Sequence, residues 1–153
     1  MKSTGGDHIG MSSLNRFLEA QEHMYATALE ESKNGEKESH WMWYIFPQLR
    51  GLGYSPMSYL YGINGIEEAR AYLAHPVLSA RLVEISKALL AHRTKCIRDI
   101  MGDIDAIKLR SSMTLFASIS ESNSVFHQIL DCFYGGTMDK MTLKLMKIIY
   151  SQD

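Results

Sequence analysis

The chain has 153 residues, of which 46% are hydrophobic and 22% charged, and its formal net charge at pH 7 is −1. These values fit a single packed domain, and they argue against nucleic-acid binding, which usually needs an excess of basic charge. The longest apolar run, residues 41–46, is far shorter than the roughly 20 residues that a transmembrane helix needs. We therefore expect a globular protein that binds neither nucleic acid nor membranes.

The cysteines and the first residues bear on the cellular compartment. Cys96 and Cys132 are far apart in the sequence and form no CxxC motif. A single disulfide would satisfy this pattern, but two reduced thiols are the simpler interpretation. The opening sequence MKSTGGDHIG lacks the apolar stretch of a signal peptide. We expect a cytoplasmic protein whose residues 1–11 are disordered.

The first half of the chain begins with helical patterns. Apolar residues recur with the period of an α-helix after Ser12 or Ser13, either of which could cap a helix that ends at Gly35. Ser39 could cap a second helix over residues 41–46, and the proline that follows disfavours its continuation.

Three helix starts are then predicted from polar residues at their N-termini. Ser55 and His75 are each followed directly by a proline, which is favoured in the first turn of a helix. Asn64 could cap the helix between them, in whose first turn two glutamates suit the helix dipole. The next start is Asp103, which we expect to cap a helix that runs to about residue 119.

Two more helices complete the chain. Asn123 or Ser124 could open the first, and the glycines at 135–136 would end it. Thr137 or Asp139 could begin the last, which should run to about residue 150.

No run longer than about four residues alternates as a β-strand does, and no internal repeat is present. The fold class that we predict is all-α, a single compact domain of six or seven helices over residues 12–153.

The usual catalytic signatures are absent. The sequence contains no GxSxG, HExxH, phosphate-binding loop or GxGxxG motif. The six histidines do not have the spacing of metal ligands, so we expect no metal and no cofactor. Whether the protein is an enzyme stays open at this point.

One arginine stands out in the aromatic part of the chain. Arg50 is the only charged residue between Glu38 and Glu67, and seven of the fifteen aromatic residues lie in the same interval. Such an arginine could cover the carbonyls at a helix C-terminus, or pair with a distant acid such as Asp103 or Asp131. Alternatively, it presents its guanidinium to an external anion, beside aromatic rings that suit a planar group.

A second polar group lies on a predicted helix. Lys108, Ser111 and Ser112 are neighbours there at i, i+3 and i+4. A cation and two hydroxyls suit a phosphate or carboxylate, although serines in helices often bond to the preceding turn instead. His40, at the start of the aromatic helix, could act as a general acid–base or could merely cap or pack.

Three long segments resemble a known family. SHWMWYIFPQLRGLGYSPMSYLYGI, EARAYLAHPVLSARL and KLRSSMTLF occur in this order, as in a family of uncharacterised bacterial proteins, domain of unknown function 1810. The resemblance covers nearly the whole chain from about Leu14 and implies an all-helical single domain, but it implies no activity. Polar residues also mark the family pattern, which favours a site where Gln48, Lys108, Ser111 and Ser112 converge. Some members carry the name calpastatin, which we reject because that inhibitor is a disordered chain with few aromatic residues.

Two functions fit these observations. The first is binding of a small anionic and partly planar ligand, such as a nucleotide or sugar phosphate, with or without catalysis by His40. The ligand-binding candidates are Trp41, Trp43, Gln48, Arg50, Tyr61, Lys108, Ser111 and Ser112. The alternative is a protein–protein interaction module that uses the aromatic segment 40–61. A concave polar cleft would favour the ligand, a flat exposed apolar patch would favour the module, and complete burial would mean that the segment is core.

Overall fold

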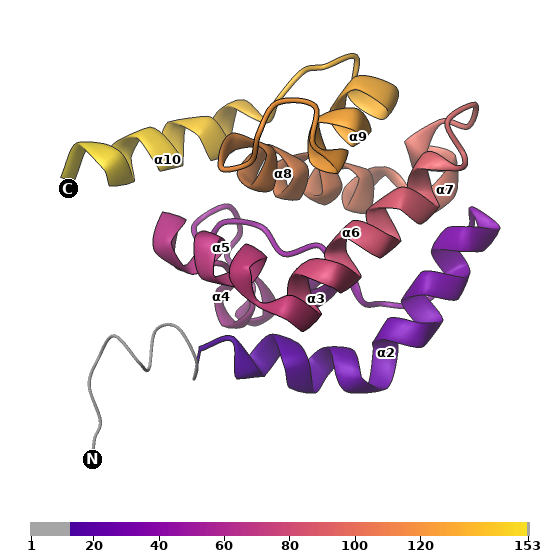
Figure 1. The fold of residues 1–153 in the computed structure, drawn as a ribbon, viewed down its shortest axis with the longest axis horizontal. Coiled ribbons are helices and arrows are strands. Elements are labelled where there is room, and N and C mark those ends of the chain that lie inside the picture. Colours follow the sequence, from indigo (N-terminus) through magenta and orange to yellow (C-terminus); the bar gives the residue numbers. More distant parts are fainter. Residues whose placement is uncertain (1–12, 153) are drawn as a thin grey trace.

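The computed structural model describes residues 13–152, with side chains to residue 147, and every regular element within them is an α-helix. Six of these helices have ten residues or more and three have four or five. Labelled as in Figure 1, they are α2 (Asn15–Asn34), α3 (Met42–Ile45), α4 (Pro56–Leu60), α5 (Gly65–Ala74), α6 (Pro76–Leu90), α7 (Ile97–Met101), α8 (Asp103–Ser118), α9 (Val125–Tyr134) and α10 (Lys140–Gln152). The predicted all-α fold is confirmed, although α7 was not expected. The expected disorder of residues 1–11 lies outside the described residues.

The helices are arranged around α6 (Figure 1). This helix packs against α2 on one side and against α9 on the other, and α9 packs in turn on α8. The short α3 contacts both α2 and α8, while α10 lies against α5 and α8. The core between these helices is rich in aromatic side chains, and the largest that are fully buried are Trp41, Tyr72, Phe17, Phe46 and Phe116. Among the described residues, no helix is long and apolar enough to span a membrane.

Several predicted helix ends are confirmed. Gly35 ends α2 in the left-handed conformation, with φ of 72°. The Ser55 hydroxyl accepts a hydrogen bond from the Ser58 N–H at 3.1 Å and so caps α4. His75 caps α6 through its Nδ1, which accepts the N–H groups of the second and third helical residues. Ser124 caps α9 through its hydroxyl. These ends depend on residues close together in the sequence, which is why local patterns predict them.

The expected serine caps of the first two helices are wrong. Leu14 stands at the N-cap of α2 and makes no side-chain cap, so Ser13 does not cap this helix, and Ser12 lies outside the described residues. Trp41 occupies the N-cap of α3, because the Ser39 hydroxyl donates to Glu31 Oε2 at 2.6 Å instead.

Two other expected caps differ in detail. Asn64 does precede α5, but its side chain makes no cap; its own N–H instead donates to Glu68 Oε1 at 2.8 Å. Gly102 occupies the N-cap of α8 with φ of 89°, and Asp103 is the first helical residue. Asp139 behaves as predicted, since its carboxylate accepts the N–H of the third residue of α10 at 2.8 Å.

Candidate functional site

The loop that follows α3 is fixed by backbone hydrogen bonds to a distant segment. The Arg50 N–H donates to the Ile63 carbonyl at 2.9 Å, and the Ile63 N–H donates to the Gln48 carbonyl at 2.9 Å. Leu49 and Ile63 form an isolated parallel bridge and are both buried. Because successive side chains of an extended segment point to opposite sides, Gln48 and Arg50 lie on the side away from the core and are half-buried.

Close backbone contacts hold this loop against two helices. A Cβ added at Gly62 would come within 2.8 Å of the Arg50 Cα and 2.7 Å of the Ser58 carbonyl oxygen. Only glycine therefore allows the Arg50 backbone to lie so close to the end of α4. On the other side, a Cβ at Gly51 would meet Leu145 of α10 at 3.5 Å. The position of Arg50 is thus set mainly by the close approach of its backbone to Gly62.

Arg50 is held through one of its nitrogen atoms. Its Nε donates to the Tyr59 carbonyl at 3.1 Å, near the C-terminus of α4, and its guanidinium carbon lies 4.8 Å from the centroid of the Tyr59 ring. No carboxylate pairs with Arg50 among the described residues. Arg50 does cover a helix C-terminal carbonyl, one of the two roles considered above, but in the described part of the chain its two terminal amino groups have no hydrogen-bond partner.

Arg16 shows how this fold uses an arginine for structure. Its two terminal nitrogens donate to the Glu68 carboxylate at 2.8 and 3.1 Å, and its nitrogens also bond the carbonyls of Leu60 and Gly62. Glu68 is almost completely buried, so the pair joins α2 to α5 within the core. Arg50 has fewer partners: among the described residues its two terminal amino groups make no hydrogen bond and remain available at the protein surface, as do those of Arg93.

A second group joins α3 to α8, and we call it the Trp43–Lys108 cluster. The Lys108 ammonium lies 3.9 Å from the centroid of the Trp43 ring and 3.5 Å from Asp105 Oδ1. Asp105 Oδ2 also pairs with Lys37 at 2.7 Å. The Lys37 side chain is only 7% exposed and that of Lys108 is 21% exposed. One carboxylate thus lies between two ammonium groups, and the cluster keeps a net positive charge.

Glu31 fixes the chain that leads into α3. Its carboxylate accepts the N–H groups of Glu38 and Ser39, the Ser39 hydroxyl and, at 2.9 Å, the indole N–H of Trp41. Burial alone would raise the pKa of Glu31, but these hydrogen bonds outweigh it and lower the pKa to about 2. His40 lies within this fixed turn, is exposed, and makes no side-chain hydrogen bond in the described part of the chain.

Four predicted site residues lie in or beside the core. Trp41 and Ser112 are fully buried, and Ser111 is nearly so, with its hydroxyl donating to the Ile107 carbonyl at 3.3 Å. The Ser112 hydroxyl has no partner among the described residues. Tyr61 is half-buried and packs against other aromatic rings. This differs from the expectation that these side chains converge on a ligand.

The remaining candidates fall into two groups. Trp43 and Lys108 form one, and Arg50 with Tyr59 forms the other, while the described contacts join neither group to the other. Gln48 makes no side-chain hydrogen bond in the part of the chain that is described. Sequence reasoning missed Glu31, Lys37 and Tyr59, because their roles arise from contacts that the chain path creates and that periodicity does not encode.

Other sites of the molecule lie apart from these groups. A depression of about 390 Å³ runs along α2 between Ala26 and Glu38, and another of about 330 Å³ lies between the end of α6 and α9 beside Cys132. No predicted site residue lines either depression. Within the described residues, no three histidine, cysteine or acidic side chains are grouped so that they could hold a metal ion.

The helical fold and the polar residues around α3 and α8 define the class: a small all-α domain with cation–aromatic groups on its surface. The chain matches the family described as Protein of unknown function (DUF1810) over residues 11–146, and it therefore belongs to that family. The resemblance noted in the sequence is confirmed.

A solved protein has the same fold. The crystal structure of the conserved hypothetical protein Rv1873 from Mycobacterium tuberculosis is 45% identical, with a TM-score of 0.85, and the match covers 88% of this chain and 96% of that one. The comparison with curated proteins finds no match. Neither the family nor the solved protein is described by an activity, so function has to be argued from the geometry.

Proposed function

We propose that the protein binds a small anionic ligand with a planar group, such as a nucleotide or a sugar phosphate. The supporting observation is the state of Arg50, which donates through its Nε to the Tyr59 carbonyl, is half-exposed and has no acidic partner among the described residues. Two unused terminal amino groups on one plane form a bidentate donor that matches phosphate or carboxylate.

The planar part of the ligand has an aromatic partner next to this arginine. The Tyr59 ring lies beside the guanidinium and is 70% exposed, and Tyr54 on the preceding loop is fully exposed. Exposed aromatic rings stack well on bases and on other planar groups. A ligand whose phosphate meets Arg50 would therefore have an aromatic surface within reach of its ring.

The Trp43–Lys108 cluster supplies a second positive group on the neighbouring surface, and the Gln48 amide lies on the loop between α3 and Arg50. We assign no reaction to the protein. If the ligand is a substrate, His40 is the exposed side chain of this segment that could transfer a proton.

We place this activity in the cytoplasm of a bacterium. Cys96 and Cys132 are both free thiols in the structure, as is usual for proteins of a reducing compartment. The similar solved protein also comes from a bacterium.

A thermal-shift series with AMP, adenosine, ribose 5-phosphate and inorganic phosphate tests the proposal. At about 100 times its Kd, a bound ligand should raise the unfolding midpoint by roughly 5–10 °C. Arg50→Gln should abolish this shift, and Arg50→Lys, which keeps the charge but loses the planar fork, should retain only part of it. Arg93→Gln is the matched control, because among the described residues the Arg93 side chain also bonds only a backbone carbonyl, and it is more exposed than that of Arg50.

Three results separate the possibilities. A shift by AMP in the parent and in Arg93→Gln, but not in Arg50→Gln, supports the proposal. Equal shifts in all variants would mean that Arg50 is not the anchor. No shift with any of the four compounds would contradict binding of this ligand class.

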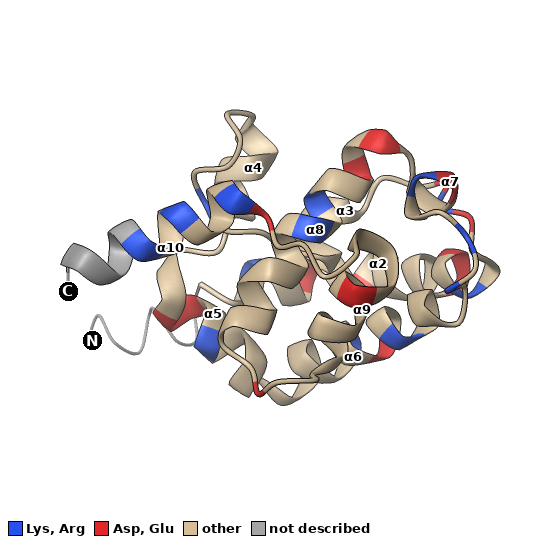
Figure 2. Ribbon diagram, turned by 90° about the horizontal axis from the view of Figure 1, so that it is seen from above, with Lys and Arg blue, Asp and Glu red and all other residues tan. Residues whose placement is uncertain are grey.

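A second candidate function is an interaction module, and the exposed apolar side chains of α4 favour it. Met57, Tyr59 and Leu60 are exposed together on this helix, which stands out from the body of the molecule in Figure 2. Peptides selected against the parent protein from a random library would test it. Two results together would favour the interaction module over the ligand. AMP should not stabilise the parent protein, and binding of the selected peptides should fall with Leu60→Ser but not with Arg93→Gln.

A further inference from the structure

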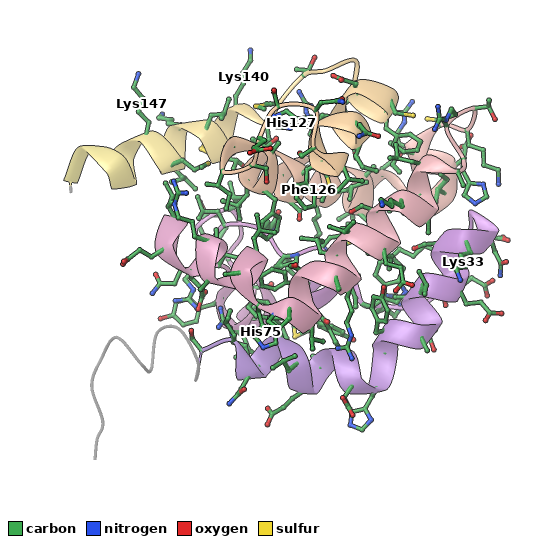
Figure 3. All side chains as sticks on the ribbon, viewed as in Figure 1. Lys33, His75, Phe126, His127, Lys140 and Lys147 are labelled. Atoms are coloured by element: carbon green, nitrogen blue, oxygen red, sulfur yellow. The ribbon has the colours of Figure 1, made fainter. Side chains whose placement is uncertain are left out.

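The outer side of α10 carries a row of lysines that the proposed site does not use. Lys140, Lys144 and Lys147 are exposed and lie at i, i+4 and i+7, which places them on one side of the helix. Figure 3 shows Lys140 and Lys147 projecting together from α10, away from the other helices. The α10 sequence contains no acidic residue.

This row continues onto α8. The Arg110 side chain donates to the carbonyls of Thr137 and Met138, at 3.0 and 3.3 Å, and so joins α8 to the start of α10. Lys108, two residues earlier on α8, points to another side of this helix, toward Trp43 of α3. In Figure 2 the blue segments of α8 and α10 follow one another across the molecule. We call this surface the basic band, and its members are Lys108, Arg110, Lys140, Lys144 and Lys147.

Two acids beside the band are engaged within the protein. The Asp139 carboxylate accepts the N–H and the hydroxyl of Thr142, at 2.8 and 2.6 Å, as the cap of α10. Asp105 is held between Lys37 and Lys108. The exposed glutamates of the first helix, by contrast, lie on the opposite side of the molecule, because α2 and α10 form its two outer edges (Figure 1). The whole-chain net charge of −1 therefore conceals a local excess of positive charge.

Aromatic rings accompany the cations along this surface. Trp43 lies against Lys108 at 3.9 Å, and the Tyr134 ring centroid lies 5.9 Å from the Arg110 guanidinium carbon. Cations that alternate with aromatic rings are typical of proteins that bind single-stranded nucleic acid, where phosphates meet the cations and bases stack on the rings.

We infer that the ligand of this surface is a single strand of nucleic acid whose phosphates follow the basic band. This inference rests on the proposed function, because one nucleotide of the strand would occupy the site at Arg50 and Tyr59. A membrane is a poorer fit to α10, because Thr142 and Met146 are buried against the protein and, among the described side chains of this helix, only Met141 and Leu143 are apolar and exposed beside the lysines, a narrow apolar face for a lipid surface.

Fluorescence anisotropy with a labelled 20-residue oligouridylate, at several salt concentrations, tests the inference. The test protein carries K140Q, K144Q and K147Q. The control protein carries the same number of charge changes at exposed lysines away from α10, namely Lys33, Lys87 and Lys95. Circular dichroism of each variant establishes that it is folded.

The expected effect follows from the release of counterions. Each lysine–phosphate contact with a single strand contributes about 0.7 to the slope of log K against log salt, or about fivefold in affinity at 0.1 M salt. The α10 variant should therefore bind about 100-fold more weakly than the parent, with a slope smaller by about 2. The control variant should bind within about twofold to threefold of the parent, because screening limits the effect of distant charges.

Binding of AMP and of anionic vesicles by the same proteins separates this inference from the proposed function. If the α10 variant loses the oligouridylate but still binds AMP, the inference is supported. If AMP binds and the α10 variant binds oligouridylate as the parent does, the inference is wrong and the proposed function stands. If neither AMP nor oligouridylate binds the parent, both are wrong. Binding of the parent to phosphatidylserine vesicles without any binding to oligouridylate would identify a membrane as the occupant and overturn the inference.

Discussion

At the scale of single residues, the position of Arg50 depends on what its neighbours lack. Gly62 has no side chain, so the Arg50 backbone can lie directly against it, and no acid occupies residues 39–66 to neutralise the guanidinium. The absence of acids can be read directly from the sequence, but the contact between Gly62 and the Arg50 backbone cannot. A lone charge can be counted along the chain, whereas the need for glycine at position 62 follows only from a contact with a residue twelve positions away.

Gly62→Ala tests this contact. Its Cβ would approach backbone atoms of Arg50 and Ser58 to within 2.8 and 2.7 Å, so the loop and the end of α4 must move apart. We expect the free energy of unfolding to fall by about 1–3 kcal/mol, as for other overpacked sites, and ligand binding at Arg50 to weaken. Urea denaturation measures the first effect. An unfolding free energy within about 0.5 kcal/mol of the parent would show that the backbones are not in this close contact.

The carboxylate of Glu31 should make the stability of the protein depend on pH. The hydrogen bonds to its carboxylate lower the pKa of Glu31 from 4.5 to about 2 against the opposing effect of burial. A carboxyl with a lower pKa in the folded state stabilises the protein above its unfolded pKa, and this stabilisation is lost as the pH falls. It should therefore be complete above about pH 5 and disappear between about pH 4.5 and pH 2.

The comparison of Glu31→Gln with the parent isolates this contribution. At pH 7 we expect the variant to be less stable by about 1 kcal/mol, allowing for solvent screening of a partly exposed group. Denaturant unfolding from pH 7 to pH 2.5 should show the difference between the two proteins shrinking below pH 4.5. A difference that stays constant with pH would mean that the charged carboxylate is not what the Ser39 and Trp41 donors stabilise.

At the scale of helices, caps formed by residues next to the helix were predictable from the sequence. Hydrogen bonds that a distant residue makes with a candidate cap were not. Ser55 and His75 cap the helices that follow them because donor and acceptor are only two or three residues apart. Ser39 has the same local chemistry, but Glu31 of α2 takes its hydroxyl, so α3 begins at Met42 without a side-chain cap. Helices as short as α3 and α7 gain little from their own hydrogen bonds and depend on tertiary packing, which periodicity cannot reveal.

The contribution of the His75 cap to the stability of the protein can be predicted and tested. His75→Ala removes the acceptor of two helix N–H groups and should lower the free energy of unfolding by about 1 kcal/mol. His75→Asn offers a shorter side-chain acceptor at the same position and should restore most of the loss. Thermal or urea unfolding of the parent and the two variants measures their order of stability. If the asparagine variant is no more stable than the alanine variant, the histidine acts through packing rather than as a cap.

The contact between α3 and α8 can be measured directly. Lys108 and Trp43 are 65 positions apart in the sequence and meet only in the folded protein, with the ammonium 3.9 Å from the ring centroid. A double-mutant cycle of Trp43→Leu and Lys108→Met should give a coupling free energy of about 0.5–1 kcal/mol. A coupling of zero would mean that Asp105 alone holds the lysine in place.

At the scale of the whole molecule, α6 lies between α2 and α9, and the outer helices differ in charge. Composition indicated a single packed domain and helical periodicity indicated an all-α fold, and the all-α fold is confirmed. Composition also indicated a net charge near zero, from which we expected no nucleic-acid partner, but a net charge does not reveal that three exposed lysines lie on one side of α10. Averaging charge over the chain discards the information on which this surface depends.

The candidate site was only partly predictable for the same reason. Trp41 and Trp43 are indistinguishable by composition, but the first is fully buried and the second half-exposed beside Lys108. With only four residues in α3, the sequence contains too few turns to assign its faces by periodicity. The prediction of Arg50 as an anchor needed no such assignment, because it rests on the absence of other charges from its segment.

Calorimetric titration of AMP into the parent, Arg50→Gln and Arg93→Gln at one salt concentration tests the central claim most directly. If Arg50 anchors an anionic planar ligand, the parent and Arg93→Gln should bind AMP with the same Kd. Arg50→Gln should bind AMP at least about tenfold more weakly, because it loses one bidentate charge-assisted contact. Adenosine, which lacks the phosphate, should bind all three proteins equally weakly. Equal affinity of the parent and Arg50→Gln for AMP, or no heat of binding in the parent, would contradict the claim.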